Sequence, residues 1–248
     1  MYKLLAITNR KLCNKDFLEQ IKKICTLNNN KELYTFNNNK ELYTTENKEH
    51  YTLNNCNIKQ DGLNNNTKKT TMLKDTNKVV SSVSIVLREK DLSEIEYKAL
   101  AEKVLKVCRE NNTECILHTY HKVARELDFK KLHVPLHVLK SNPHISKEFI
   151  VIGVSIHSVD EAIEAANLGA TYITAGHIFA TECKKYLPPR GLDFLTSVCN
   201  AVQIPVYAIG GISPENAQQA IDAGATGVCI MSGLMKCKDP KELFTIHH

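Results

Sequence analysis

The chain has 248 residues, a formal net charge of +5 and nine cysteines. Its length suits one domain with a substantial core, although two smaller domains would also fit. The positive charge is mild and scattered, which indicates solvated helix faces rather than a nucleic-acid-binding surface. No stretch approaches the roughly 20 apolar residues that cross a membrane, so we expect a cytoplasmic protein that binds neither nucleic acid nor membrane.

The cysteine pattern excludes the common metal and redox motifs. No pair has the C-x-x-C spacing of a zinc ribbon or a thioredoxin-type site. The number is odd, and several cysteines lie inside apolar runs such as 227–233. This pattern predicts reduced, mostly buried thiols.

The chain opens with a predicted strand at 2–8 and a predicted helix at 14–24. Asn14 is available as the helix cap, and Phe17, Ile21 and Ile24 follow at helical spacing. This strand–helix pair is the first unit of an alternating pattern.

A segment of different composition follows at 26–78. It is rich in Asn, Lys and Thr, and it repeats with a period of nine residues, as in 28–36 and 37–45. Each unit offers at most one Leu and one Tyr, so burial cannot offset the entropy of ordering it. We expect a poorly ordered surface insertion within one domain that spans 1–248.

The rest of the chain alternates short β-rich runs with longer amphipathic stretches. The predicted strands are 81–89, 114–119, 132–136, 148–157, 171–179, 206–211 and 227–233. The predicted helices are 92–112, 123–128, 158–170 and 213–225. Such alternation indicates a parallel sheet, either closed or open and doubly wound. Eight strands in this length, with glycine-rich turns after the last two, favour a single (β/α)₈ TIM barrel.

Two turns near the C-terminus are suited to binding phosphate. Gly210 and Gly211 follow the seventh predicted strand and precede a helix, so backbone N–H groups could approach an anion there. Ser232 and Gly233 follow the eighth strand in the same way. Barrels of this class often bind phosphate at these two turns.

Polar side chains at the other strand ends should face the same rim. Histidine can move a proton near neutral pH, and His157 and His177 end neighbouring strands. Candidates to contact substrate are Arg88, Lys90, His133 and His177.

A metal site is not expected. Magnesium prefers carboxylate oxygens, but the third strand ends in His118 and Thr119. Glu89 and Asp91 lie beside Arg88 and Lys90, where surface ion pairs are the simplest interpretation.

Five motifs in order resemble the thiamine phosphate synthase superfamily, and within it the TenI group. They are "LREKDLSEIEYKALAEKVLKVC" (87–108), "LHVP" (132–135), "GVSIHSVDEA" (153–162), "GHIFATECKKYLPPRGLDFL" (176–195) and "AIGGISPENAQQAIDAGATGVCIMSG" (208–233). The resemblance covers 1–24 and about 82–240. It implies a (β/α)₈ barrel, often dimeric, that acts on phosphorylated substrates in thiamine biosynthesis.

Some residues depart from the pattern of the synthases, which join a pyrimidine diphosphate to a thiazole phosphate with magnesium. Val86 stands where that pattern has Gln, and His118–Thr119 stand where it has Asn-Asp, the Asp serving the metal. Cys183 replaces a Thr of the loop after the sixth strand. These departures predict weak binding of magnesium diphosphate.

The motifs "GHIF" and "TECKK" look instead like TenI proteins. That resemblance implies a thiazole tautomerase, which aromatises a carboxythiazole phosphate by a proton shift without metal or other cofactor. His157 would be the acid/base residue, Lys184 would meet the substrate carboxylate, and the two turns at 210–211 and 232–233 would hold the phosphate.

Two alternatives remain open. The first is thiamine phosphate synthase activity, which would bring Mg²⁺ with it. The second is a non-catalytic ligand-binding or regulatory protein, which the altered positions Val86, His118 and Thr119 and the inserted repeat suggest.

Overall fold

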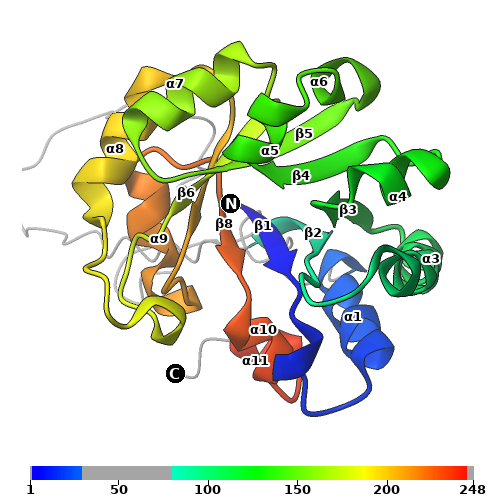
Figure 1. The fold of residues 1–248 in the computed structure, drawn as a ribbon. Coiled ribbons are helices and arrows are strands. Elements are labelled where there is room, and N and C mark those ends of the chain that lie inside the picture. The colour runs from blue at the N-terminus through cyan, green and yellow to red at the C-terminus, as the bar shows by residue number, and fades with distance from the viewer. Residues whose placement is uncertain (1, 30–79, 245–248) are drawn as a thin grey trace, which may run out of the picture. The chain divides into compact units, whose positions relative to one another are not determined.

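The computed structural model describes residues 2–29 and 80–244, and in them eight parallel strands close into a barrel in sequence order. Figure 1 shows the strands at the centre with the helices outside them. The strands are β1 (Tyr2–Ile7), β2 (Val80–Leu87), β3 (Glu114–His118), β4 (Lys131–Pro135), β5 (Val151–Ile156), β6 (Tyr172–Gly176), β7 (Val206–Ile209) and β8 (Gly227–Ile230). The predicted (β/α)₈ TIM barrel is confirmed.

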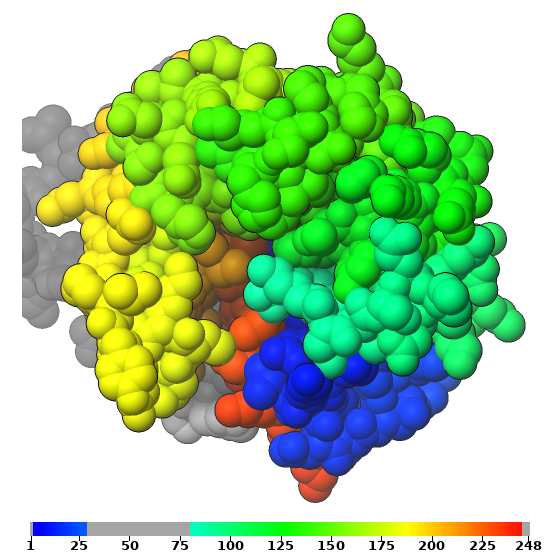
Figure 2. Space-filling model, viewed as in Figure 1, coloured from blue at the N-terminus to red at the C-terminus, as the bar shows by residue number. Residues whose placement is uncertain are grey.

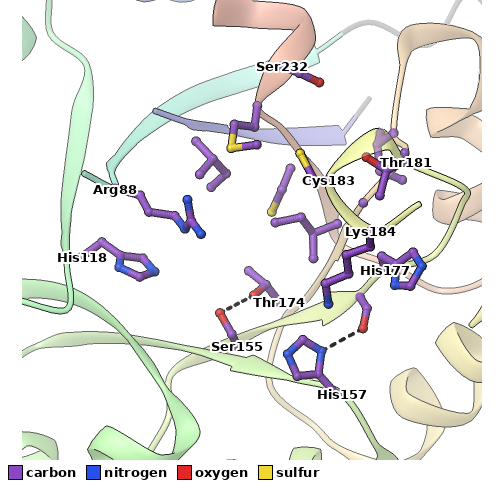
Figure 3. A pocket seen from close by; sticks show the side chains of 18 of the residues that line it. Arg88, His118, Ser155, His157, Thr174, His177, Thr181, Cys183, Lys184 and Ser232 are labelled. Atoms are coloured by element: carbon purple, nitrogen blue, oxygen red, sulfur yellow. Dashed lines mark hydrogen bonds between the residues drawn. The ribbon is translucent and has the colours of Figure 1, made fainter. Parts of the chain in front are cut away.

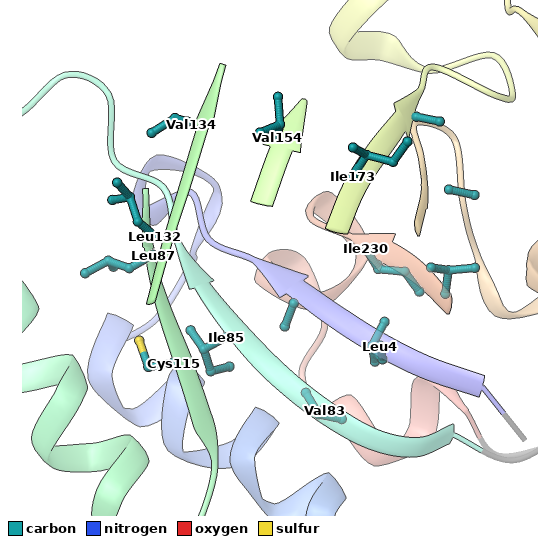
Figure 4. Packing of buried hydrophobic residues seen from close by; sticks show 14 of the residues in the cluster. Leu4, Val83, Ile85, Leu87, Cys115, Leu132, Val134, Val154, Ile173 and Ile230 are labelled. Carbon is teal, nitrogen blue, oxygen red and sulfur yellow. The ribbon is translucent and has the colours of Figure 1, made fainter. Parts of the chain in front are cut away.

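The two-residue period of each strand divides the core into two layers. In β1, Leu4 and Ala6 belong to the large cluster between strands and helices, whereas Leu5 and Ile7 belong to a smaller cluster inside the barrel. Figure 4 shows the outer layer, in which Leu4, Val83, Leu132 and others leave the strands toward the helices. The same alternation therefore sends the intervening polar residues of β3 to β6 into the barrel.

Helices connect the strands and cover their outer faces. They are α1 (Phe17–Cys25), α3 (Glu94–Glu110), α4 (His121–Glu126), α5 (Leu136–Ser141), α6 (Ile145–Glu148), α7 (Val159–Asn167), α8 (Gly191–Ala201), α9 (Pro214–Asp222), α10 (Ser232–Lys236) and α11 (Pro240–Leu243). Short 3₁₀ helices are η1 (Arg10–Leu12), η2 (Thr26–Asn29) and η3 (Glu182–Lys184). No helix of the described residues is long and apolar enough to span a bilayer.

Side chains that accept hydrogen bonds from the backbone determine where several helices begin. Ser93 and Ser158 accept hydrogen bonds from the backbone at the third helical position of α3 and α7. The cap of α1 is Asp16 rather than Asn14, because the Asp16 carboxylate accepts from Glu19 N at 2.9 Å. The helix therefore begins later than predicted.

The predicted insertion begins too early at residue 26. Leu27 is buried, and Asn28 accepts from Val83 N at 2.7 Å while donating to Val83 O at 3.0 Å. These two hydrogen bonds satisfy the backbone of Val83 in β2, so Thr26–Asn29 belong with the barrel. The remainder of the repeat, 30–79, lies outside the described residues.

Candidate active site

A cavity of about 330 Å³ opens at the carboxyl ends of the strands. Figure 2 shows it as a hollow at the centre of one face. All eight strands contribute to its wall, either directly or through the residues that follow them. The lining includes Ile7, Arg88, Lys90, His118, Pro135, Ser155, His157, Thr174, His177, Thr181, Cys183, Lys184, Ile209, Gly210, Gly211, Cys229, Met231 and Ser232.

The lining is cationic. It contains Arg88, Lys90 and Lys184, and no Asp or Glu among the described residues contributes to it. Burial lowers the pKa of Arg88, and burial together with the charge of Arg88 lowers the pKa of Lys90. An anionic ligand would compensate this charge.

Glu89 and Asp91, the acids adjacent to Arg88 and Lys90 in the sequence, interact with residues of the β1 loop. Arg10 on the β1 side binds Asp91 through both guanidinium nitrogens, at 2.7 and 2.8 Å, and approaches Glu89 at 3.2 Å. Glu89 is buried, not a surface acid as expected, and it also accepts from the Thr8 hydroxyl at 2.7 Å. The expected ion pairs with Arg88 and Lys90 are therefore wrong, and the acids instead join the β1 and β2 loops.

His118 ends β3 and is only 4% exposed, yet it lines the cavity. Its Nδ1 lies 2.7 Å from the hydroxyl of Thr119, whose φ of 69° is unusual for a β-branched residue. Burial, His133, Arg88 and Lys90 together hold the pKa of His118 well below its usual value. His118 is therefore a neutral imidazole beside two cations.

His133 lies below the cavity rather than in its wall. Its Nδ1 is 2.9 Å from the hydroxyl of Tyr172, and its Nε2 is 2.8 Å from the hydroxyl of Ser155. A side chain at Gly153 would collide with both His133 and Tyr172, so this glycine allows the two to meet. Burial lowers the pKa of His133 to about 3. The expectation of substrate contact does not fit this position, because both ring nitrogens are engaged inside the barrel.

His157 follows β5 and is exposed at the cavity. Its Nδ1 lies 3.0 Å from the carbonyl oxygen of Gly176, which can only accept a hydrogen bond. In the neutral ring Nδ1 therefore carries the proton, and Nε2 is an acceptor.

His177 and the glycine turn pack against each other. A Cβ at Gly210 would lie 2.2 Å from that of His177, and a Cβ at Gly211 would meet the backbone of the β6–α8 loop at 2.4 Å. His177 is buried, with Nε2 3.3 Å from Leu187 O. These glycines thus have a packing reason as well as the predicted role in binding phosphate.

The glycine turn also presents backbone donors. Among the turn and loop hydrogen bonds of the described residues, none is donated by the N–H of Gly210, Gly211 or Ile212. Ser232 lines the cavity, although its hydroxyl points away from the other labelled side chains in Figure 3, whereas Gly233 is not part of the wall. The predicted phosphate-binding residues therefore come together at 210–211 and 232.

Lys184 reaches the cavity from the loop after β6. In Figure 3 its side chain points toward the strand ends that carry Ser155 and His157. Its neighbour Lys185 is not in the wall and lies 5.6 Å from the centre of the Tyr186 ring. Only the first lysine of "TECKK" is thus placed to meet a ligand.

Sequence reasoning missed Thr174 and Thr8. Thr174 donates to Ser155 at 3.3 Å, and both line the cavity. Thr8 positions Arg88, because its hydroxyl accepts from Arg88 N at 2.9 Å. The alternation of β6 could have identified Thr174 as inward-facing, but no local signal marks Thr8.

The residues present do not fit a protein-held magnesium ion. The cavity wall offers no carboxylate, and no group of three or more His, Cys, Asp or Glu in the described residues could hold a metal. Glu89, the acid adjacent to Arg88, is engaged by Thr8 and Arg10.

Comparison with known proteins identifies the family. A family model described as thiamine monophosphate synthase matches residues 60–234. The chain belongs to this family. It is 32% identical to the thiamine-phosphate synthase of Clostridium acetobutylicum over 161 residues, covering 64% of this chain and 76% of that protein. The thiamine-phosphate synthase of Roseiflexus castenholzii is 35% identical over 161 residues, which cover 64% of this chain and 71% of that protein.

A solved structure supports the fold. The thiamine phosphate pyrophosphorylase of Pyrococcus furiosus superposes with a TM-score of 0.62 at 20% identity, covering 98% of this chain and 92% of that one. It shows the same barrel.

The curated relatives correct the expected activity. They are named thiamine-phosphate synthases, which are transferases. The prediction of a TenI-like tautomerase, an isomerase, is therefore wrong. The local motifs around His177 and Cys183 that suggested it did not outweigh similarity to the synthases over 161 residues.

Proposed function

We propose that this chain acts as a thiamine-phosphate synthase, which joins a pyrimidine diphosphate to a thiazole phosphate and expels the diphosphate. The observation that carries this proposal is one cavity with two separate groups of residues that are suited to binding anions. One group is the glycine turn after β7, and the other is Arg88, Lys90 and His118 after β2 and β3. A monophosphate ligand alone would need only one of them.

The barrel places the two groups across the cavity from each other. In a closed eight-stranded barrel, β3 and β7 are four strands apart, which is the greatest separation possible. A phosphate on the turn at 210–211 and a diphosphate beside His118 could therefore occupy the cavity together. Their heterocycles would meet between them.

The phosphate of the thiazole suits the turn at 210–211. The N–H groups of this turn point to no backbone acceptor in the described loops, and α9 begins three residues later, with its positive dipole end there. Ser232, at the end of the neighbouring strand, would complete this group.

The centre of the cavity suits flat heterocycles. Ile7, Ile209, Cys229 and Met231 supply apolar wall. Most ligand pockets combine such walls with a few polar groups that fix orientation. His157 Nε2 would accept a hydrogen bond from the pyrimidine amino group, and Lys184 would face the departing diphosphate.

A coupling assay tests the proposal. Purified protein is incubated with both substrates, and thiamine phosphate and pyrophosphate are quantified against mixtures that lack either substrate. Equimolar products that require both substrates would support the proposal. Tight binding of both substrates without any product would favour the non-catalytic alternative.

A further inference from the structure

The cationic side chains of the cavity have no acidic partner in the part of the chain that the structure describes. Among the described residues, Arg88, Lys90 and Lys184 take part in no ion pair. The neighbouring acids are already bound, since Asp91 lies 2.7 Å from Arg10 and 3.0 Å from Lys11. The protein therefore leaves the positive charges of Arg88 and Lys90 uncompensated where they follow β2, and that of Lys184 uncompensated in the loop after β6.

The charge of Arg88 is held in a partly buried position. Arg88 is half-buried and its backbone N–H is fixed by Thr8, whereas Lys90 beside it is exposed. Gathering partly desolvated like charges is costly unless an anion joins them. The same positive field repels a divalent cation, and no carboxylate in the cavity wall opposes that repulsion.

His118 can supply a hydrogen-bond donor to an anion. Its Nδ1 lies 2.7 Å from the hydroxyl of Thr119, and when this hydroxyl donates to the ring, Nδ1 is the acceptor. A neutral imidazole that accepts at Nδ1 carries its proton on Nε2. Figure 3 shows the ring beside Arg88, at the edge of the cavity. In that tautomer, Nε2–H is available to an oxygen of an anion.

We propose that the Arg88, Lys90 and His118 side of the cavity binds a diphosphate directly, without a divalent metal ion, and that His118 Nε2–H donates a hydrogen bond to it. The identity of the ligand rests on the proposed synthase function. The mode of binding departs from the magnesium dependence that the family resemblance implies. Binding Mg²⁺ reduces the negative charge of a diphosphate, so the metal complex is attracted less strongly to these cations.

Calorimetric titration of the full chain with inorganic pyrophosphate tests the metal independence. One titration contains excess EDTA and the other contains saturating MgCl₂. We expect pyrophosphate to bind in EDTA with a Kd no higher than in magnesium. A Kd lowered about tenfold or more by magnesium, which corresponds to about 1.4 kcal/mol, would overturn the proposal, as would the absence of binding in EDTA.

Substitution of His118 tests its role. His118→Phe keeps a ring of similar size but removes the donor, and we expect pyrophosphate in EDTA to bind about tenfold more weakly. His137→Gln, an exposed histidine outside the cavity wall, is the matched control and should bind as the wild type does. Thermal unfolding midpoints establish that both variants are folded, and Arg88→Met provides a second test if His118→Phe unfolds. Unchanged pyrophosphate affinity in a folded His118→Phe would remove His118 from the site, and an unchanged affinity in Arg88→Met would overturn the whole subsite.

The experiments distinguish failure of the synthase function from failure of metal-free diphosphate binding. Pyrophosphate binding in EDTA without a coupling reaction would leave the metal-free subsite standing and remove the synthase function. A coupling reaction accompanied by strictly magnesium-dependent pyrophosphate binding would support the synthase function and overturn the metal-free subsite.

Discussion

Thr8 and Glu89 join the first two strands of the barrel beneath the cavity rim. The Thr8 hydroxyl donates to Glu89 Oε1 at 2.7 Å and accepts from Arg88 N at 2.9 Å. Glu89 also accepts from Arg10 N, at 3.0 Å to Oε1 and 3.1 Å to Oε2. A buried carboxylate therefore fixes the backbone from which Arg88 enters the cavity.

Thr8→Val should destabilise the protein and weaken anion binding together. Valine has a similar shape, but it leaves Glu89 short of one donor and Arg88 N without its acceptor. We expect a loss of about 1–3 kcal/mol in the free energy of unfolding, because buried polar groups are left unsatisfied. Urea denaturation and pyrophosphate titration measure the two effects. Loss of stability with unchanged affinity would show that Thr8 does not position Arg88.

Gly210→Ala should cost more stability than Gly191→Ala. Both glycines have positive φ, at 94° and 78°, so alanine is strained at each by about 1 kcal/mol. Only Gly210 is also crowded, since its added Cβ would overlap His177, whereas nothing lies within 4 Å at Gly191. Chemical denaturation of the two variants separates backbone strain from steric overlap. Equal losses would contradict the close packing at Gly210.

Lys184→Gln should impair the proposed coupling reaction, and Lys185→Gln should not. The two lysines are adjacent, but only Lys184 lines the cavity. Loss of one charge contact to a phosphate group is expected to reduce kcat/KM about tenfold or more. Steady-state kinetics on both variants measure this difference, and similar values for the two would indicate that Lys184 serves only as a surface charge.

The buried histidines should make the fold sensitive to mild acid. Burial lowers the pKa of His133 to about 3, and the pKa of His118 is also well below 6.5. Between these values the unfolded chain binds more protons than the folded one, so stability is complete above about pH 6.5 and falls as the pH decreases. From pH 6.5 to 5, His133 should cost about 1.5 kcal/mol, and His118 should act in the same direction.

Urea midpoints across this interval test the effect, since few carboxylates titrate there. His133→Gln retains hydrogen-bonding capacity but does not titrate, so its stability should fall less steeply with decreasing pH than that of the wild type. An identical slope in the two proteins would show that His133 does not control the acid response.

Much of the fold could be predicted from the sequence, because the hydrophobic period of each element agrees with the cap and turn residues at its ends. Strand alternation, the serine caps at Ser93 and Ser158, and the glycine turn at 210–211 are local signals. The short helices α5 and α6 after β4 were not predicted, since six and four residues are too few to show a helical period. Asn28 was assigned to the insertion because composition alone does not reveal its hydrogen bonds to β2.

The site was only partly predictable, because its organisation depends on contacts between distant segments. The cations at Arg88 and Lys90 and the cavity position of His157 follow from strand order. The engagement of Glu89 by Arg10 could not be inferred, since it joins residues 79 positions apart. The inward position of His133 follows from alternation within β4, but its two buried partners come from β5 and β6.

A crystal structure with thiazole phosphate and pyrophosphate bound together, in the absence of divalent metal, tests the central claim most directly. We predict the phosphate on the N–H groups of Gly210 and Gly211, and the pyrophosphate across the cavity on Arg88 and His118. Both anions on the same side of the cavity, or pyrophosphate bound outside it, would contradict the account.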